Sequence, residues 1–472
     1  MNTFFNTILI LLLTLSLSSA HAAELSETAK SRISNESDQL IKKYTDLDIF
    51  SGVVLLAENG RPFYQKAFGL ANRDENIPNT INTKFDIGSM NKTFTKVVVY
   101  QLMQEDRLKL DDKLGNYLEG FPKEAAESIT INMLLHHQSG YGDYHSPDYF
   151  DSPKEEKRIS QLVERIKKMP LLFHPGTDQQ YSNAGYILLG AIIEKITGKS
   201  YHENVKERIV KPLELTETYV ENKHSVQARA VGYFKNAKGE IQNNEGFLEI
   251  PKPDGGFQST TSDILKFYQE YFYGNKLLSD EIKNSLDEFN YYDEVRKTEG
   301  AIPQAGGFEG ANTVIYEVLR DQISIIVFAN MDEPVAEQLG AGILAIVRGK
   351  EPGEPALPAI QNIYRTLVER SPHYVRENFE ELTKNFHPSD PKDLILNQVG
   401  YTFLFDGQID KAIEAFQLNV ELFPNIANCY DSLGEALLEK GDREEALKNY
   451  KKALELNHEM PSAKEKVKEL SK

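Results

Sequence analysis

Ser89 and Lys92 are three residues apart, and in a helix that spacing places a hydroxyl and an amine on the same face. A serine hydroxyl attacks a carbonyl only when a base removes its proton. A neutral lysine amine can be that base when burial and the positive end of a helix lower its pKa. The same pattern recurs at Ser389 and Lys392, where Pro391 argues against catalysis. By itself the pattern is therefore better explained by a helix-capping serine and a solvated lysine.

A phenol and an amide follow at Tyr181 and Asn183, at a turn into an amphipathic helix that Gly198 ends. The Tyr181 hydroxyl could exchange a proton with Lys92. Tyr273 and Asn275 repeat this three-residue pattern, so it too is a weak signal alone.

A third segment, residues 304–310, precedes a predicted strand that begins at Thr313. Its glycines, Gly306 and Gly307, allow a ligand to come close to the backbone. A backbone N–H there could face a developing oxyanion.

The elements that must position these residues predict an α+β fold. Residues 52–57 and 62–68 read as a hairpin around 58–61, and β-branched runs return at 313–318 and 322–329. Between about 85 and 215 the apolar spacing is helical. An antiparallel sheet built from both ends of a domain, flanked by helices and carrying a helical subdomain between them, satisfies this order.

Beyond this domain the chain repeats itself. Pro352, Pro355 and Pro358 indicate a boundary, because neither a helix nor a central strand tolerates them. At a period of 34, Gly400 pairs with Gly434, Leu404 with Leu438, Gly407 with Gly441, Ala412 with Ala446, Phe416 with Tyr450 and Leu422 with Leu456. The pattern resembles tetratricopeptide repeats and predicts an all-α domain. Since two repeats cannot bury a continuous core, we expect a degenerate helix pair at 360–386 and a closing helix at 462–470 to cap them.

Composition excludes several classes of function. The 472 residues carry 53 Lys and Arg against 71 Asp and Glu, a net charge of −18, which disfavours nucleic acid and anionic lipid as partners. The single cysteine, Cys429, excludes internal disulfides and thiolate metal cages. His136 and His137 are adjacent and would point apart on a helix, so we expect no metal and no cofactor.

The first residues resemble a secretory signal. An apolar run from Phe4 to Leu17 precedes small residues, which predicts cleavage after Ala22 and no membrane span afterwards, although no Lys or Arg precedes the run. The expected domains are therefore the signal peptide at 1–22, a hydrolase domain at 23–350, a linker with the helix pair at 351–392, and repeats with a closing helix at 393–472. The expected location is the periplasm or the outside of the cell.

Four motifs occur in the order seen in beta-lactamase-related serine hydrolases. They are residues 85–92, 134–140, 174–183 and the segment around Gly306 and Gly307. The resemblance covers roughly 45–348 and implies a sheet with a helical domain and an acyl-enzyme mechanism. It implies Ser89 as nucleophile, Lys92 and Tyr181 sharing base and acid duty, Asn183 binding substrate, and the amides of Ser89 and Gly307 as an oxyanion hole. Gly255 to Asp263 resembles another family segment and is assigned to architecture, with contact to the substrate cleft as the alternative.

The sequence departs from the family at Gln304, where Lys or His commonly opens the third motif. A neutral amide loses the charge-assisted bond to a substrate carboxylate, so we predict poor beta-lactam hydrolysis. The predicted activity is that of an esterase or amidase acting on a small acyl or D-amino-acid substrate, with Gln304, Gly306 and Gly307 in the binding site. Two alternatives stay open: a beta-lactamase or D-alanyl-D-alanine carboxypeptidase, and a non-catalytic module whose repeats bind a protein or peptide.

Overall fold

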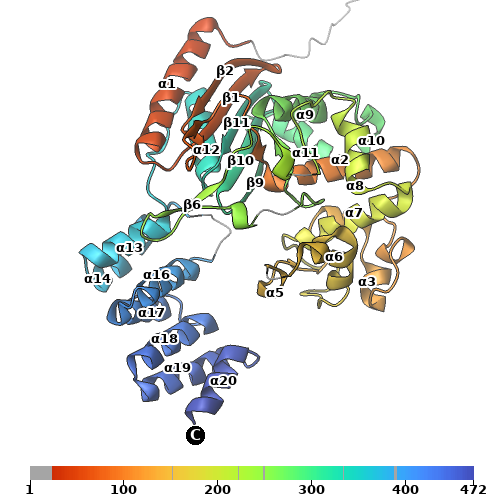
Figure 1. Cartoon of the computed structure of the whole chain (residues 1–472). Helices are drawn as coiled ribbons and strands as arrows, with labels where there is room; N and C mark the ends of the chain where they lie inside the picture. The colour runs from red at the N-terminus through yellow and green to blue at the C-terminus, as the bar shows by residue number, and fades with distance from the viewer. Residues whose placement is uncertain are drawn as a thin grey trace, which may run out of the picture.

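The computed structural model describes residues 24–150, 152–221, 223–247, 250–332, 334–386 and 391–471. The predicted signal peptide at 1–22 lies outside these residues, as does Ser389. Figure 1 shows a sheet with helices on both sides, a second group of helices beside it, and a column of helices that ends at the C-terminus.

A five-stranded antiparallel sheet in the order β2-β1-β11-β10-β9 forms the centre. The strands of the described chain are β1 (Gly52–Glu58), β2 (Arg61–Phe68), β3 (Leu70–Asn72), β4 (Ile77–Pro78), β5 (Phe85–Asp86), β6 (Tyr233–Lys235), β7 (Ile241–Asn243), β8 (Gln258–Ser259), β9 (Ile302–Phe308), β10 (Ala311–Val318) and β11 (Ile323–Ala329). The predicted hairpin and the two late strands are confirmed. β9 was not predicted as a strand, because its two glycines weaken the strand pattern.

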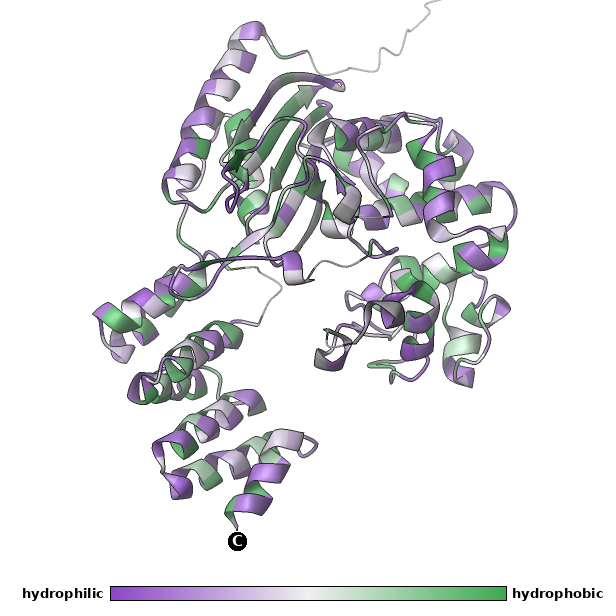
Figure 2. Cartoon of the chain, viewed as in Figure 1, coloured by the Kyte–Doolittle hydropathy of each residue, from purple (hydrophilic) through white to green (hydrophobic). Residues whose placement is uncertain are grey.

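The inner strands β1, β10 and β11 are buried on both faces and are mostly apolar rather than alternating (Figure 2). The edge strands β2 and β9 are partly exposed and carry polar residues. Val54 and Leu56 face α1 and α12, while Val53 and Leu55 face the cluster that includes α2 and α9. The helices and short helical turns up to residue 347 are α1 (Glu27–Asp46), η1 (Gly88–Asn91), α2 (Lys92–Gln104), η2 (Leu114–Asn116), α3 (Lys123–Ser128), α4 (Ile131–Leu135), α5 (Pro147–Phe150), η3 (Lys154–Lys157), α6 (Ile159–Ile166), α7 (Asn183–Thr197), α8 (Tyr201–Val205), η4 (Lys206–Val210), η5 (Lys223–Ser225), η6 (Glu245–Phe247), α9 (Thr261–Tyr273), α10 (Asp280–Ser285), α11 (Asp287–Arg296) and α12 (Val335–Val347).

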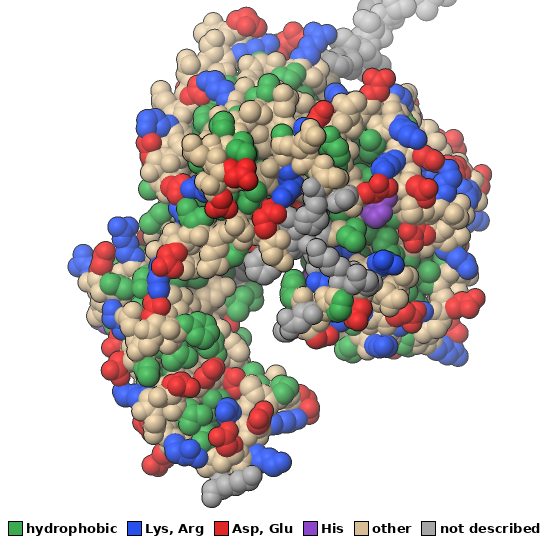
Figure 3. Space-filling view, in the orientation of Figure 1, with side chains coloured by type: hydrophobic (Ala, Val, Ile, Leu, Met, Phe, Trp, Pro, Cys, Tyr) green, Lys and Arg blue, Asp and Glu red, His purple; other side chains and the backbone are tan. Residues whose placement is uncertain are grey.

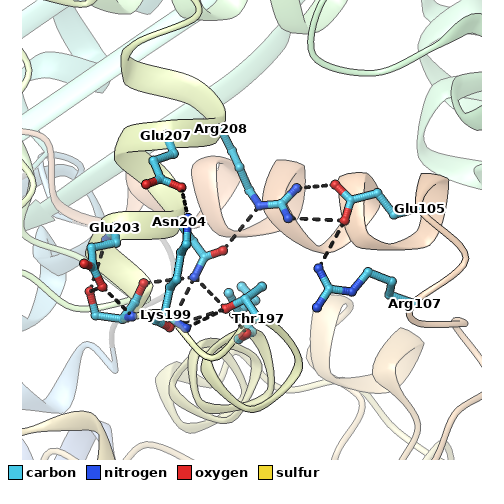
Figure 4. Close-up of polar contacts among 10 residues, drawn as sticks. Glu105, Arg107, Thr197, Lys199, Glu203, Asn204, Glu207 and Arg208 are labelled. Atoms are coloured by element: carbon cyan, nitrogen blue, oxygen red, sulfur yellow. Dashed lines mark hydrogen bonds and ion pairs between the residues drawn. The ribbon is translucent and has the colours of Figure 1, made fainter.

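A polar cluster fixes the far ends of α2 and α7 (Figure 4). The Arg208 guanidinium donates to both carboxylate oxygens of Glu105, at 2.6 and 3.2 Å, and to Asn204 Oδ1 at 3.3 Å. Asn204 in turn donates to Thr197 Oγ1 at 2.9 Å. Since α2 begins at Lys92 and α7 begins at Asn183, this cluster holds the two helices whose first residues come from the predicted site.

After α12, residues 349–358 contain no helix or strand. The C-terminal helices are α13 (Ala359–Glu369), α14 (Pro372–Glu377), α15 (Phe379–Leu382), α16 (Asp393–Phe405), α17 (Ile409–Leu422), α18 (Ala427–Lys440), α19 (Arg443–Leu456) and α20 (Pro461–Leu470). They share one apolar cluster. Helices therefore occupy the positions predicted for the degenerate pair, the two repeats and the closing helix.

The turn between β6 and β7 joins this helical column to the rest of the chain. Ala237 is 2% exposed and belongs to the apolar cluster of the C-terminal helices, and Lys238 donates to Asp406 Oδ1 at 2.6 Å. Charges of both signs are mixed over the face seen in Figure 3. No helix among the described residues combines the length and apolar character that crossing a membrane requires.

Candidate active site

Ser89 lies on the 3-10 turn η1, directly before α2, and β9 packs against this turn. A Cβ placed on Gly306 would lie 2.5 Å from the Ser89 backbone nitrogen, and one on Gly88 would lie 2.5 Å from the Gly307 nitrogen. No side chain fits between the two segments. Gly88 and Gly306 therefore allow the two backbone segments that carry the Ser89 and Gly307 amides to pack in direct contact. An oxyanion hole requires backbone amides that are close together in this way.

The Ser89 hydroxyl receives two hydrogen bonds. Lys92 Nζ donates to Ser89 Oγ at 2.8 Å, and Tyr181 OH donates to the same atom at 2.7 Å. The Lys92 nitrogen also lies 4.9 Å from the centroid of the Tyr181 ring. Three side chains that carry a hydroxyl, an amine and a phenol thus meet at one point, although Tyr181 is 92 residues from Ser89 in the chain.

Lys92 is 6% exposed, and its amine has two further acceptors. Asn183 Oδ1 accepts from Lys92 Nζ at 2.7 Å, and the Asp254 backbone carbonyl accepts at 2.6 Å. A buried amine with three acceptors has one defined orientation, since each of its protons is directed. Lys92 is therefore aimed at Ser89.

Tyr181 is 52% exposed and stacks on His137, with 4.7 Å between ring centroids. His137 Nδ1 accepts a hydrogen bond from the Ser182 backbone N–H at 3.1 Å. Burial, together with the positive charge of Lys92, lowers the pKa of His137 from 6.5 to about 4. His137 is thus a neutral support for Tyr181 at neutral pH, which agrees with the structural role that we expected for it.

Ser89, Asn183 and Gly307 line an open cleft of about 240 Å³. Buried charges line it too: Lys223 forms an ion pair with Asp86, which also accepts from the Gly88 backbone N–H at 2.9 Å. The apolar side chains of Phe150, Ile250 and Phe308 complete the lining together with His145, Lys252, Asp254, Gly255, Gly256 and Glu309. The cleft is large enough for a small substrate that has both polar and apolar parts.

Gln304 and Gly306 lie beside the cleft and are not among the described residues that line it. Gln304 is half-buried, and its Oε1 accepts from Thr93 Oγ1 at 3.5 Å. Gly306 packs behind Ser89. The structure thus brings Ser89, Lys92, Tyr181, Asn183 and Gly307 together and places Gln304 next to α2.

Sequence analysis did not single out Asp143 and Asp254, which contact this group, or Tyr144, which contacts Asp254. All three residues form hydrogen bonds that join distant segments. Their only sequence signal was proximity to motifs, because Asp143 follows the 134–140 motif and Asp254 precedes the 255–263 segment. Gly255 and Gly256, which we assigned to architecture, line the cleft, so the alternative fits the structure better.

His136 and His137 are not joined by further metal ligands. Within the described ranges, no three His, Cys, Asp or Glu side chains come together in a way that could hold a metal ion.

Comparison with known proteins agrees with this geometry. The beta-lactamase family model matches residues 37–342, and a tetratricopeptide repeat model matches residues 427–459. The chain is 32% identical to the teichoic acid D-alanine hydrolase of Staphylococcus aureus over 288 residues, which are 58% of this chain and 70% of that protein. It is 28% identical to penicillin-binding protein 4* of Bacillus subtilis over 319 residues, which are 60% of this chain and 69% of that protein.

Among solved structures, the D-amino acid amidase of Ochrobactrum anthropi SV3 superposes with a TM-score of 0.57 at 18% identity, covering 67% of this chain and 99% of that one. This likeness confirms the α+β fold. The family match spans most of the chain and contains Ser89, Lys92 and Tyr181. The chain belongs to the beta-lactamase family of serine hydrolases and carries a tetratricopeptide repeat near its C-terminus.

Proposed function

We propose that this protein hydrolyses an ester or amide of a D-amino acid or another small acyl group through an acyl-enzyme on Ser89. One observation carries the proposal: Ser89 Oγ accepts hydrogen bonds from both Lys92 Nζ and Tyr181 OH. A hydroxyl held between an amine and a phenol has a short route for its proton to leave as it attacks a carbonyl.

The acylation step starts from a Lys92–Tyr181 pair that lacks one proton. Ser89 Oγ bonds to the substrate carbonyl carbon, and its proton passes to this pair. The carbonyl oxygen becomes an oxyanion facing the amides of Ser89 and Gly307. When the carbon–leaving-group bond breaks, the same pair returns the proton to the leaving group. Water then attacks the acyl-serine, loses a proton to the pair and releases the acid, and Ser89 regains its proton. The base is assigned to the pair, because Lys92 Nζ and Tyr181 OH both contact Ser89 Oγ.

The substrate class rests on two supports. One named relative is a D-alanine hydrolase. In addition, Gln304 opens the third motif, where the family commonly has Lys or His, and a neutral amide forgoes a charge-assisted bond to a substrate carboxylate of about 1.5 to 3 kcal/mol. We therefore rank D-aminoacyl esters and amides above carboxylate-bearing substrates.

A panel of substrates tests this proposal. Purified protein is assayed on a D-alanyl ester, its L-enantiomer, D-alaninamide and a chromogenic cephalosporin, with Ser89→Ala as the control. Turnover of a D-alanyl compound that Ser89→Ala abolishes is the expected result. Rapid turnover of the cephalosporin would instead support the beta-lactamase alternative, and no turnover of any compound would favour the non-catalytic binding module.

For the C-terminal helices we propose an intramolecular brace on the hydrolase domain. Ala237 is buried in their apolar cluster and Lys238 pairs with Asp406, which supports a fixed junction between 23–350 and the repeats. A groove for a protein or peptide is the competing function.

We also propose that residues 1–22 are a cleaved secretory signal, because an apolar run followed by small residues is typical of one. The intact mass of the mature protein tests this, since cleavage after Ala22 leaves Ala23 as the first residue.

A further inference from the structure

Lys92 donates hydrogen bonds to Asn183 and Asp254 as well as to Ser89. Two consecutive residues of one loop contact these two further acceptors. Asp143 contacts Asn183, and Tyr144 contacts Asp254. The loop is itself tied to the start of α7, because Ser182 Oγ donates to the Gly142 carbonyl at 3.1 Å. The loop therefore has a fixed position relative to the helix that carries Asn183.

Asp143 determines which way the Asn183 amide faces. Asp143 Oδ2 accepts from Asn183 Nδ2 at 2.7 Å. Asp143 Oδ1 is occupied by His145, whose backbone N–H lies at 3.0 Å and whose ring Nδ1 lies at 2.8 Å. Burial raises the pKa of Asp143, but the hydrogen bonds from His145 and Asn183 outweigh it and leave this pKa below its usual value, so the group is an acceptor at neutral pH.

A reversed Asn183 amide would be disfavoured on both sides. Its nitrogen would face the Lys92 amine, donor against donor, and its oxygen would face the Asp143 carboxylate, acceptor against acceptor. With Asp143 in place, Asn183 presents its oxygen to Lys92 and keeps the amine directed at Ser89.

Tyr144 supports the other acceptor. It is 1% exposed, and its hydroxyl donates to Asp254 Oδ2 at 2.7 Å. Asp254 is also buried, and its backbone carbonyl is the group that accepts from Lys92. Tyr144 thus anchors the residue whose carbonyl directs a second Lys92 proton.

We propose that Asp143 and Tyr144 are positioning residues that aim the Lys92 amine at Ser89, Asp143 through Asn183 and Tyr144 through Asp254. This inference rests on the proposed function, since it assigns a task within the same site. Neither residue touches Ser89 in the structure, so both act through the groups that they hold.

The test measures how fast a fluorophosphonate labels Ser89, together with kcat and KM on any ester that the protein turns over. Asp143→Ala is expected to slow labelling about 10- to 100-fold and Tyr144→Phe about 3- to 10-fold, since small misplacements of a catalytic group have effects of this size. Both should lower kcat more than they raise KM. Asp143→Asn is expected to slow labelling less than Asp143→Ala, because its amide oxygen can still accept from Asn183 although its NH2 group then faces the His145 backbone N–H.

Matched controls come from the chain itself. Tyr141→Phe removes a buried hydroxyl with no hydrogen-bond partner among the described residues, in the same loop, and Asp178→Ala removes an exposed carboxylate in the loop before Tyr181. Both should label at the wild-type rate. In an Asn183→Ala background, Asp143→Ala should add less than a twofold effect, since its route to Lys92 is already gone.

The outcomes separate this inference from the proposed function. If the wild-type protein is not labelled at all, the proposed function fails. If it is labelled and folded Asp143→Ala and Tyr144→Phe are labelled just as fast, the positioning inference alone is wrong. Full additivity of Asp143→Ala with Asn183→Ala would also overturn it, because the two residues would then act by separate routes.

Discussion

The cleft and the helical repeats assemble from residues at very different separations along the chain. Lys92 hydrogen-bonds to Asn183 and Asp254, which are 91 and 162 residues away. In the repeats, the ring of Phe416 packs over Gly400 and that of Tyr450 over Gly434, each within one helix pair. Hydrogen bonds between oriented polar groups hold the cleft together, whereas the packing of apolar side chains holds these repeat helices together.

Because of this difference, substitutions in the two regions should change different properties of the protein. A polar group removed from the cleft leaves the packed sheet intact and changes the chemistry. A side chain added between two repeat helices leaves the chemistry intact and changes the free energy of unfolding.

The largest effects should come from the reacting groups of the cleft. Ser89→Ala, Lys92→Ala and Tyr181→Phe should each lower kcat by at least ~10³, because residues that act as a unit lose most of the rate together. The melting temperatures should stay near that of the wild type. Steady-state kinetics on a turned-over ester checks this, and a near-normal rate in any variant would remove that residue from the mechanism.

In the repeats, Gly400→Val should destabilise without affecting chemistry. A Cβ at Gly400 would lie 2.7 Å from Phe416 Cδ1, so the helices must separate, at a cost of about 3 kcal/mol. Urea unfolding and the labelling rate of Ser89 are the two readouts. Gly434→Ala is the matched control, since its Cβ would meet the Tyr450 ring at 3.2 Å. Equal stability of the two variants, or slower labelling of Gly400→Val, would break the comparison.

The cleft should also make stability depend on pH through His137. Its pKa is about 4 in the folded protein and 6.5 as a free side chain, so the unfolded state binds the proton first as pH falls. Stability should therefore be full above pH 6.5 and fall by about 2 kcal/mol toward pH 4, after allowing for solvent screening.

His137→Asn should remove this slope, because asparagine tolerates the positive φ of 58° at this position and does not titrate. Thermal unfolding of both proteins from pH 4 to 8 gives the difference. Identical pH profiles would show that His137 is not held neutral beside Lys92.

The smallest effect should come from the junction between the two regions. Lys238→Ala should lower the free energy of unfolding only slightly, because its ion pair with Asp406 is a surface pair, and such pairs contribute little to stability. Deletion of residues 359–472 should lower the melting temperature of the hydrolase domain by a few degrees, because Ala237 loses its apolar cover. If the deletion changed neither the melting temperature nor the catalytic rate, the proposed brace would be wrong and a binding groove would be favoured.

The repeats could be predicted in detail from sequence because their contacts are local. The 34-residue period, the Gly400–Phe416 type of pair and the closing helix all follow from helical spacing. The central hairpin and the last two strands could also be predicted, because long runs of apolar and β-branched residues are typical of buried strands.

The cleft could be predicted only in part. Ser89 and Lys92 are close in sequence, so their spacing alone suggested a pair. Tyr181, Asn183 and Gly307 were assigned to the site only from the family motifs, because no local pattern indicates that their segments meet. Strand β9 was not predicted because Gly306, which packs closely on Ser89, weakens the strand pattern. The contacts of Asp143 and Tyr144 were not predicted, because a single hydrogen bond between residues more than 30 positions apart produces no periodic pattern in the sequence.

The most direct test of an activated Ser89 is the intact mass of the mature protein and of Ser89→Ala after exposure to a fluorophosphonate. The account predicts one adduct on the wild-type protein and none on the variant. A folded wild-type protein without an adduct, or an adduct that persists on Ser89→Ala, would contradict it.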